Sequence, residues 1–367
     1  MKGFGTSSHL EIGDRVYYIE TSYLSAQGEI FSKVTREGKV VSIKRIEVDK
    51  DLEERKIFET LKNFHENLVN EIKTWLSIKE KVKEEPLEMY VKLAEKMLRI
   101  GLLEESKELL EDKIKLNENY GPLNFVLGQI YFYLKDYEKS SLFFEKAIQD
   151  RDYANYFLWA GRVFRIKNEF TRSISYLKKA IEKNPSYAEA HFEMGLSLLD
   201  LVLNSGSTIP FKTIILSFKS AEILDPRFRN EKFKNGLTLL ENGEIVEAKR
   251  LFEEFFYSLK PHDVHEILEE FIILTKYADR EKLRIVVDDY ILKLKELRDE
   301  HPEYADVRFN LALAFFIKIK TLFEEAQIEL ENALSINPDY EAAKKALELL
   351  KNESEGFALF IKTIGRL

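Results

Sequence analysis

The sequence of 367 residues predicts a mainly α-helical protein, in which a solenoid of helix pairs follows a small antiparallel β module. Two observations predict this fold class. A glycine recurs along much of the chain with an alanine after it, which is typical of stacked helix pairs. Alternating β-branched and polar residues occur near the N-terminus. We therefore expect strands at the start of the chain and helices over the rest.

The segment from Asp14 to Val48 has the residue alternation of β-strands. Gly28 and the pair Glu37-Gly38 divide it into three runs, which predicts three antiparallel strands. The runs are 15–23, 29–36 and 39–48. Three strands with one apolar face are not stable alone, so the face should pack on the following helix or on a second copy of the chain.

A long helix is predicted from about Asp51, a residue type common at helix N-caps, to about Glu84. Its apolar residues recur at the spacing of one helix face. They are Leu52, Ile57, Leu61, Phe64, Leu68, Ile72, Trp75 and Ile78. This helix is the natural cover for the sheet.

The repeat becomes visible after Pro86. Gly128 and Gly161 are 33 residues apart, and Ala147 and Ala180 follow them at equal distance. The step from Gly195 to Gly236 is 41, which indicates an insertion of about seven residues over the period of a helix pair. Prolines that end successive units are Pro185, Pro226, Pro261, Pro302 and Pro338.

A small residue in the middle of the first helix lets the second helix approach closely. A second small residue near the end of the second helix leaves room for the next pair. Large side chains at these two positions would push the helices apart. The spacing thus has a packing reason.

This pattern resembles the tetratricopeptide repeat, whose units carry an aromatic residue, Leu-Gly and Tyr on the first helix, and Ala, Phe, Ala and Pro on the second. The clearest matches are Leu127-Gly128 with Tyr131, Phe144 and Ala147, then Gly161 with Phe164, Ala180 and Pro185, then Gly195 with Phe218, Ala221 and Pro226. The resemblance implies a right-handed solenoid of about seven helix pairs. Its units are 87–120, 121–153, 154–187, 188–228, 229–262, 263–304 and 305–340.

Three domains follow from this assignment. Residues 1–85 form the β module and its long helix, residues 86–340 the repeat array, and residues 341–367 a C-terminal capping helix and tail. Phe357, Phe360 and Ile361 would fold back onto the last repeat.

In the family that the chain resembles, first-helix residues line a concave ligand groove. The resemblance places these residues at Phe125, Gln129, Phe132, Asn155, Leu158, Arg162, Arg165 and Phe192. An apolar groove with a basic spot suits an amphipathic helix or an extended peptide that carries a carboxylate. The alternative is that several of these side chains pack against neighbouring helices. The Lys and Asn clamp with which some family members bind chaperone C-termini is absent.

Composition excludes several classes of function. Lys and Arg number 56 against 64 Asp and Glu, and this net charge of −8 argues against binding to nucleic acid or an anionic membrane. With no cysteine, disulfides and thiolate metal sites are excluded. The apolar stretches are too short for a membrane span, and the N-terminus lacks a signal-like apolar stretch, so a cytoplasmic location is expected. Abundant Lys and Glu hint at a thermophile.

The β module carries a small basic patch between its tyrosines, made of Arg36, Lys39, Lys44 and Arg45. Nucleic-acid binding is one interpretation. Protection of the strand edges by charge is the preferred one, because acidic residues lie beside the patch.

No nucleotide-binding loop and no nucleophile motif is present, so the sequence predicts no enzyme, no cofactor and no metal site. The run from His262 to Glu266 has metal-ligand residue types. It follows Pro261 and fits a capped helix start better than a metal site. The insertion at 204–210 either reaches over the groove or is a tolerated surface loop.

The sequence therefore predicts a scaffold that offers a preformed concave face to a partner protein or peptide. The β module would be a second docking surface or the interface of a homodimer. One alternative is a structural or assembly component of a pilus, secretion or motility machine. Another is a regulator that senses a small ligand, for which Arg162 and Arg165 are the main indication.

Overall fold

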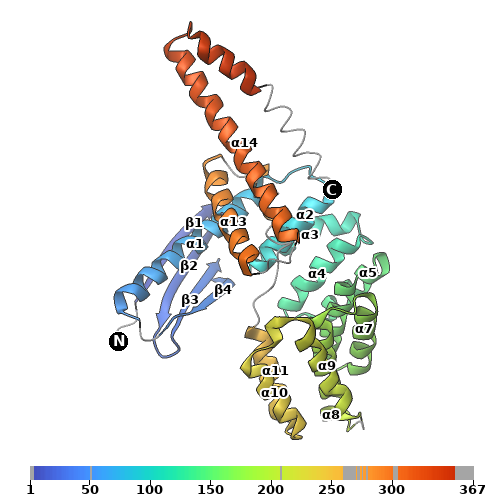
Figure 1. Cartoon of the computed structure of the whole chain (residues 1–367). Helices are drawn as coiled ribbons and strands as arrows, with labels where there is room; N and C mark the ends of the chain where they lie inside the picture. Colours follow the sequence, from blue (N-terminus) through green and yellow to red (C-terminus); the bar gives the residue numbers. More distant parts are fainter. Residues whose placement is uncertain are drawn as a thin grey trace. The chain divides into compact units, whose positions relative to one another are not determined.

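The computed structural model describes residues 4–49, 52–206, 209–258, 270, 273–274, 276–277, 280–300 and 305–351. It consists of two compact units, Met1–Pro261 and His262–Leu367 (Figure 1). The first unit holds an antiparallel sheet followed by helix pairs, so the mainly α solenoid with an N-terminal β module is confirmed. The predicted domain boundaries near residues 85 and 340 stay predictions.

The sheet has four strands, so the prediction of three was wrong. Its strands are β1 (Gly5–Ile12), β2 (Arg15–Leu24), β3 (Glu29–Arg36) and β4 (Lys39–Glu47), paired in the order β1-β2-β3-β4. The strand that sequence reasoning missed is β1. Its inward positions include Thr6 and Ser8, whose polarity hides the apolar alternation that marks a half-buried strand.

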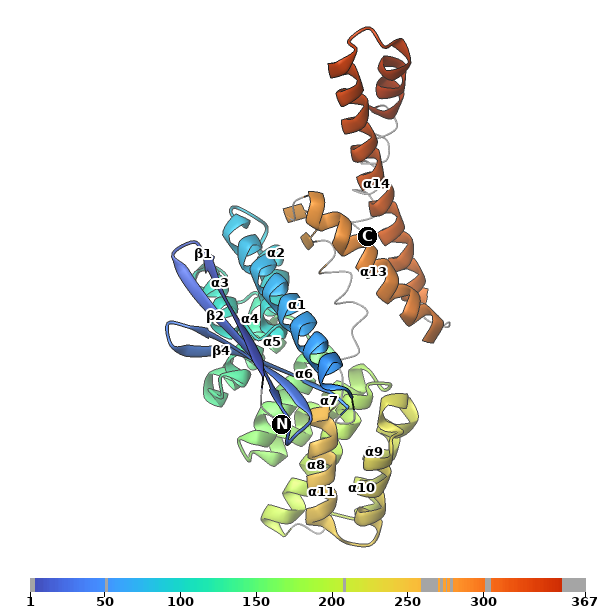
Figure 2. The same cartoon turned by 90° about the vertical axis from the view of Figure 1, so that its left-hand side faces the viewer.

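Helix α1 (Glu54–Lys81) covers one face of the sheet, as expected from its apolar stripe. Tyr23 and Ile30 of the sheet pack with Ile57 and Leu61 of the helix in one buried cluster. Figure 2 shows α1 running along the sheet. The β module therefore has its own small core.

A buried histidine joins α1 to the first two strands. His65 is 4% exposed, and its Nε2 lies 2.8 Å from Ser8 Oγ while its Nδ1 lies 2.8 Å from Thr21 Oγ1. Thr21 Oγ1 is also 2.8 Å from Ser32 Oγ. The chain of polar groups thus crosses from α1 through β2 to β3, and each imidazole nitrogen has a partner.

The β module is fastened to the first helix pair by a buried carboxylate. Glu105 of α3 (Leu103–Leu116) is fully buried and accepts from Arg36 Nη1 at 2.8 Å and from Tyr17 Oη at 3.2 Å. Burial and the Glu105 charge raise the pKa of Tyr17 to about 12, so its hydroxyl remains a donor. Ser42 Oγ adds a bond of 3.0 Å to the carbonyl oxygen of Ile100.

Much of the predicted basic patch is used in ion pairs within the chain. Arg36 bonds to Glu105, Lys44 Nζ lies 2.6 Å from Glu71 Oε2 of α1, and an ion pair of 3.6 Å joins Arg45 to a β3 glutamate. The first two contacts hold the sheet to α3 and α1, and the third lies within the sheet.

Five helix pairs follow α1 along residues 87–258. They are α2 (Leu87–Arg99) with α3, α4 (Gly121–Tyr133) with α5 (Tyr137–Asp150), α6 (Ala154–Ile166) with α7 (Phe170–Lys183), α8 (Ala188–Ser205) with α9 (Phe211–Leu224), and α10 (Glu231–Glu241) with α11 (Ile245–Ser258). A short 3-10 helix, η1 (Pro226–Phe228), links the last two pairs. These five pairs match the predicted units from 87 to 262.

The small residues do what the spacing predicts. A Cβ atom on Gly161 would lie 2.6 Å from Leu177 Cγ, so a larger residue there would force α6 and α7 apart. Ser173 Oγ, one helix away, donates to the Gly161 carbonyl oxygen at 2.7 Å. The same bond joins Ser140 to Gly128 at 2.8 Å.

The second unit differs from the prediction. Residues 305–340 were expected as a helix pair, but α14 (Ala305–Ile336) is one continuous helix that packs on α13 (Arg280–Glu300). The earlier turns use Lys135 and Asn168 in the left-handed conformation, with φ of 62° in both. Ile319 stands where that turn was expected, and a β-branched residue does not adopt this conformation.

Some predicted features lie outside the described residues. These are the N-cap Asp51, the run His262–Glu266, Pro261, Pro302, part of the 204–210 insertion, and the tail with Phe357, Phe360 and Ile361. Residues 341–351 are helical, in the place where the capping helix was expected.

Gly161→Val is expected to lower the free energy of unfolding by about 1–3 kcal/mol, because the new side chain overlaps Leu177. Urea denaturation of Gly161→Val, of Leu177→Ala and of the double variant measures these free energies of unfolding. The double variant should lose less than the sum of the single losses, since shortening Leu177 makes room. Additive losses would contradict a direct contact.

Stability should depend on pH through His65. Burial lowers the pKa of His65 below its ordinary value of 6.5, so the unfolded chain takes up this proton first as the pH falls. The stabilisation is therefore full above pH 6.5 and decreases below it, by at most about 1.4 kcal/mol per pH unit. Urea denaturation at several pH values should show a steeper loss in the natural chain than in His65→Gln. Equal slopes would contradict the assignment.

Candidate functional site

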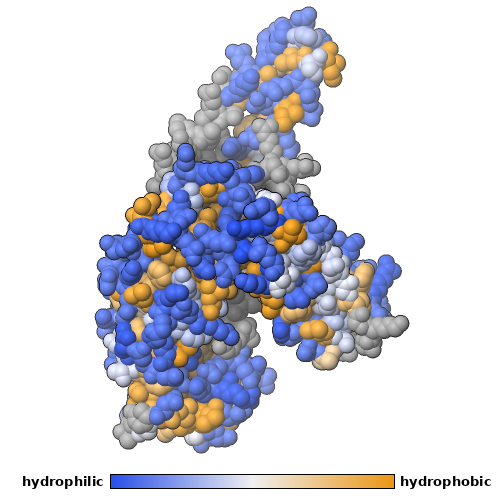
Figure 3. Space-filling view, turned by 180° about the vertical axis from the view of Figure 1, so that it is seen from behind, coloured by the Kyte–Doolittle hydropathy of each residue, from blue (hydrophilic) through white to orange (hydrophobic). Residues whose placement is uncertain are grey.

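The first helices of the pairs carry the predicted groove residues, and a charged cluster lies among them on α6 and α8. Figure 3 shows the surface from behind, where hydrophilic residues dominate and apolar ones lie in small groups. We call the charged residues of α6, α8 and α11 the groove cluster. Its members are Arg162, Arg165, Glu193, Asp200, Lys249 and Glu253.

Glu193 is the centre of the groove cluster. Its side chain is 1% exposed, and its carboxylate accepts from Arg162 Nε at 2.6 Å and from Arg165 Nε at 3.2 Å. Burial alone would raise the pKa of the Glu193 carboxyl, but the charges and hydrogen bonds of the two arginines lower it overall. Glu193 is therefore ionised and matched by cations.

Helix α11 lies against α8 and completes the cluster. Lys249 Nζ is 2.5 Å from Asp200 Oδ1, and Glu253 Oε1 is 3.3 Å from Arg165 Nη1. Residues 249, 253 and 256 share one face of the helix. Phe256 on that face stacks on the Phe192 ring, with centroids 5.1 Å apart.

The charges of the predicted basic spot, Arg162 and Arg165, are thus neutralised by carboxylates of the same chain. Arg165 bonds to Glu193, Asp200 and Glu253, and these charges raise its pKa against the opposing effect of burial. Arg162 has its guanidinium 4.6 Å from the Trp159 ring and 5.0 Å from the Phe256 ring. Loss of one partner of such a buried ion pair would leave the other charge unmatched, so the cluster has a structural role.

An aromatic group with one half-exposed ring adjoins the cluster, at the end of α4 and in the middle of α6. Phe132 meets Trp159 edge-on with ring centroids 5.4 Å apart, and Tyr133 lies 6.1 Å from the same indole. Tyr133 is 52% exposed. We call Phe132, Tyr133 and Trp159 the aromatic group.

The structure places the predicted groove residues in two classes. Phe125, Leu158, Arg162 and Phe192 are buried, while Gln129, Phe132, Asn155 and Arg165 are partly exposed. Phe125 stacks on Tyr156 with centroids 4.4 Å apart. The packing alternative therefore applies to the first class. A role of any of the eight in partner binding stays a prediction.

Sequence reasoning missed the acidic half of the groove cluster. Glu193 and Asp200 lie within an otherwise apolar stretch of α8. A carboxylate on a helix face that must be buried indicates a cation partner on a neighbouring helix. That signal could have shown that the two arginines are paired.

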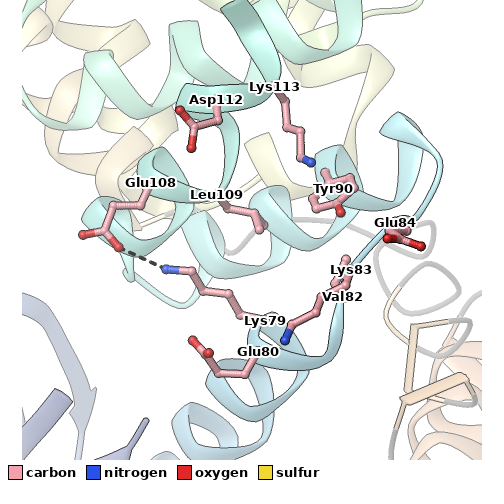
Figure 4. Close-up of a pocket in the computed structure, with 10 residues that line it drawn as sticks. All are labelled: Lys79, Glu80, Val82, Lys83, Glu84, Tyr90, Glu108, Leu109, Asp112 and Lys113. Carbon is pink, nitrogen blue, oxygen red and sulfur yellow. Dashed lines mark hydrogen bonds and ion pairs between the residues drawn. The ribbon is translucent and has the colours of Figure 1, made fainter. Parts of the chain in front are cut away.

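A separate pocket of about 400 Å³ opens between the end of α1 and the α2–α3 pair (Figure 4). Lys79 Nζ lies 3.1 Å from Glu108 Oε2 at its side, and Lys113 lies over the Tyr90 ring at 4.1 Å. Charges of both signs line the pocket, so it has no clear preference for an anion or a cation.

Within the part of the chain that the structure describes, no group of three or more His, Asp or Glu side chains is arranged for a metal ion. In the same residues, no helix combines the length and hydropathy that a bilayer span requires.

Glu193→Ala should destabilise the chain by about 3–5 kcal/mol, because two buried arginines lose their shared carboxylate. Urea denaturation measures the loss. Glu247→Ala is the matched control, since Glu247 pairs with Arg250 on the exposed side of α11 and its loss should leave the midpoint nearly unchanged. Equal midpoints for the two variants would contradict a structural role of the groove cluster.

Two family models match the chain. One, described as tetratricopeptide repeat, covers residues 122–149, and the other, described as TPR repeat, covers residues 161–202. The curated protein BBSome complex member BBS4 of Bos taurus is 26% identical over 109 residues. That segment is 30% of this chain and 21% of the relative, so the match spans about a fifth of the relative's length.

Several solved structures are similar at low identity. MamA is 19% identical, with a TM-score of 0.37 over 44% of this chain and 92% of its own. YrrB, described as a TPR protein with an unusual peptide-binding site, is 16% identical, with a TM-score of 0.34 over 64% of this chain and 96% of its own. PilW, described as a type IV pilus biogenesis factor, is 18% identical, with a TM-score of 0.38 over 62% of this chain and 100% of its own. The two family matches fall on α4 to α8, where the small residues recur at the predicted spacing, and this part of the chain contains tetratricopeptide repeats.

Proposed function

We propose that this protein is a non-enzymatic scaffold that binds a protein partner on the concave side of its repeats. The β module is its second surface, for docking or dimerisation. The aromatic group on α4 and α6 is the observation that carries the proposal. Its rings lie beside Arg162, and Trp, Tyr and Arg are the residue types that most often contribute the largest share of binding energy at protein interfaces.

The partner chemistry follows from the groove cluster. Arg162 and Arg165 are already matched by carboxylates of α8 and α11, so a partner gains little by offering another one. An apolar or aromatic anchor that covers Tyr133 and Trp159 would remove exposed apolar surface instead. An amphipathic helix supplies such anchors at regular spacing.

The position of α11 excludes part of α8 from the proposed binding surface. Phe192 packs with Phe256 of α11, so this part of α8 is covered by the chain itself. The proposed surface therefore lies on α4 and α6, with Gln129, Phe132 and Asn155 as the predicted groove residues that remain partly exposed.

Tyr133→Ala should weaken partner binding at least about tenfold, or 1.4 kcal/mol, because it removes an exposed ring at the centre of the proposed surface. The partner is first identified by affinity capture from the native lysate. Isothermal titration of the purified pair then gives the affinity of each variant.

Tyr153→Ala is the matched control for that titration. Tyr153 is 50% exposed, close to the 52% of Tyr133, and it precedes α6 instead of ending α4. Its removal should leave the affinity nearly unchanged. Equal weakening by both variants, or by neither, would remove the aromatic group from the proposal. Capture of subunits of a pilus, secretion or motility machine would favour the assembly alternative.

A further inference from the structure

The two edges of the sheet differ in how they are protected. The order β1-β2-β3-β4 makes β1 and β4 the edge strands. An edge strand presents unpaired N–H and C=O groups and serves as a template for another strand unless charge, a bulge or a neighbouring element blocks it.

The β4 edge is blocked in three ways. Its pairing with β3 shifts by a bulge between Val34 and Thr35. Three of its nine residues are Lys or Arg. The turn between α2 and α3 abuts it, because Ser42 Oγ bonds to the Ile100 carbonyl and lies 2.5 Å from a Cβ built on Gly101.

The β1 edge has none of these devices among the residues that the structure describes. Its eight residues GTSSHLEI contain no Lys, Arg or Pro, and its pairing with β2 has no register shift. Gly5, Ser7, His9 and Glu11 are exposed along its length. No hydrogen bond of the described residues closes its outer side.

The register identifies which backbone groups of β1 point outward. The hairpin closes with Ile12 opposite Arg15 around a two-residue turn, and such a closing pair exchanges both backbone hydrogen bonds. The even-numbered residues therefore bond to β2, as the bond from Tyr23 N to the Phe4 carbonyl oxygen also shows. The N–H and C=O groups of Gly5, Ser7, His9 and Glu11 point away from the sheet.

We propose that β1 pairs antiparallel with β1 of a second copy of this chain, with Ser8 on the two-fold axis, so that two sheets become one. The inference rests on the docking role that the proposed function gives to the β module. It makes the protein a two-armed scaffold, in which each copy contributes one repeat array.

Hydrogen bonding selects this register. With Ser8 opposite Ser8, the outward groups of Gly5 and Ser7 face those of Glu11 and His9 of the second copy, and none of the four residues is left unpaired. If the register is shifted by one hydrogen-bonded pair in either direction, one of these four residues in each copy no longer has another of the four as its partner.

The outward hydrogen-bonding groups of β1 are complementary to those of a second copy, and its charges do not oppose that pairing. In the proposed register Glu11 stands opposite Gly5 and His9 opposite Ser7, so no like charges face each other. On the other face, Leu10 stands opposite Thr6. A strand pair alone buries little surface, so a reversible dimer in the micromolar range is expected.

Sedimentation equilibrium of the full chain tests the proposal from micromolar to sub-millimolar concentration. The natural chain should associate to a dimer, and Ser7→Pro should remain a monomer, because it removes an outward N–H without breaking a bond to β2. Val40→Pro is the matched control. Val40 lies on the other edge strand, β4, directly after Lys39, which pairs with Arg36 at the turn, so this variant should leave the dimer intact. Circular dichroism checks that both variants are folded.

A monomeric natural chain, or a dimer that persists in Ser7→Pro, would overturn the proposal. The chain has no cysteine, so single cysteines test the register directly. Ser8→Cys should form a disulfide-linked dimer that a reductant reverses, and Ser22→Cys on the neighbouring strand should not. Equal cross-linking of both would also overturn it. Partner capture is a separate readout. A natural chain that captures its partner but does not dimerise refutes only this inference. Loss of capture in Tyr133→Ala, with the dimer retained, concerns only the proposed binding surface on α4 and α6.

Discussion

The solenoid depends on the close contact of two helices at a residue with little or no side chain. The hydroxyl groups of Ser106, Ser140 and Ser173 each donate to a main-chain carbonyl oxygen of the facing helix, at Ala94, Gly128 and Gly161. This bond is possible only because the helices approach within the reach of a serine side chain. It gives three successive pairs the same geometry, and identical pairs stack into a regular array. The aromatic group and the groove cluster owe their positions to that stacking.

The helix pairs from 87 to 258 could be predicted because their packing reason is local in sequence. Gly161 and Ala180 mark two close contacts, and both follow from steric volume alone. The single helix α14 was mispredicted because alanines and a proline recur there, while Ile319 stands where the earlier pairs have Lys135 and Asn168 in the left-handed conformation. Strand β1 was missed because Ser8 faces His65, and a polar contact between distant segments leaves no apolar pattern.

The helices that carry the candidate groove residues could be predicted, but the contacts of these residues could not, and their role in partner binding stays a prediction. The repeat spacing correctly put Arg162, Arg165 and Phe192 on neighbouring first helices, where they meet through Glu193 and Phe256. Their burial could not be predicted, because it depends on the turn of α11 onto α8. One residue does indicate a change there: Phe255 stands where the earlier units have an alanine. A buried phenylalanine in that place does not leave the room that the next regular pair needs.

The buried Glu105 at the start of the array and the turned α11 at its end have a consequence for how the number of repeats can change. Glu105 bonds the first helix pair to the sheet, and Phe255 is buried in the fifth pair, where the earlier pairs have a small alanine. In arrays of this kind each unit contacts only its neighbours, so a whole unit is gained or lost most easily where the units on both sides are alike. In this chain the first and the fifth of the described pairs differ from the others, so a unit could be duplicated with the least loss of fit in the middle, between α4 and α7. A change in the number of repeats is therefore expected inside the array.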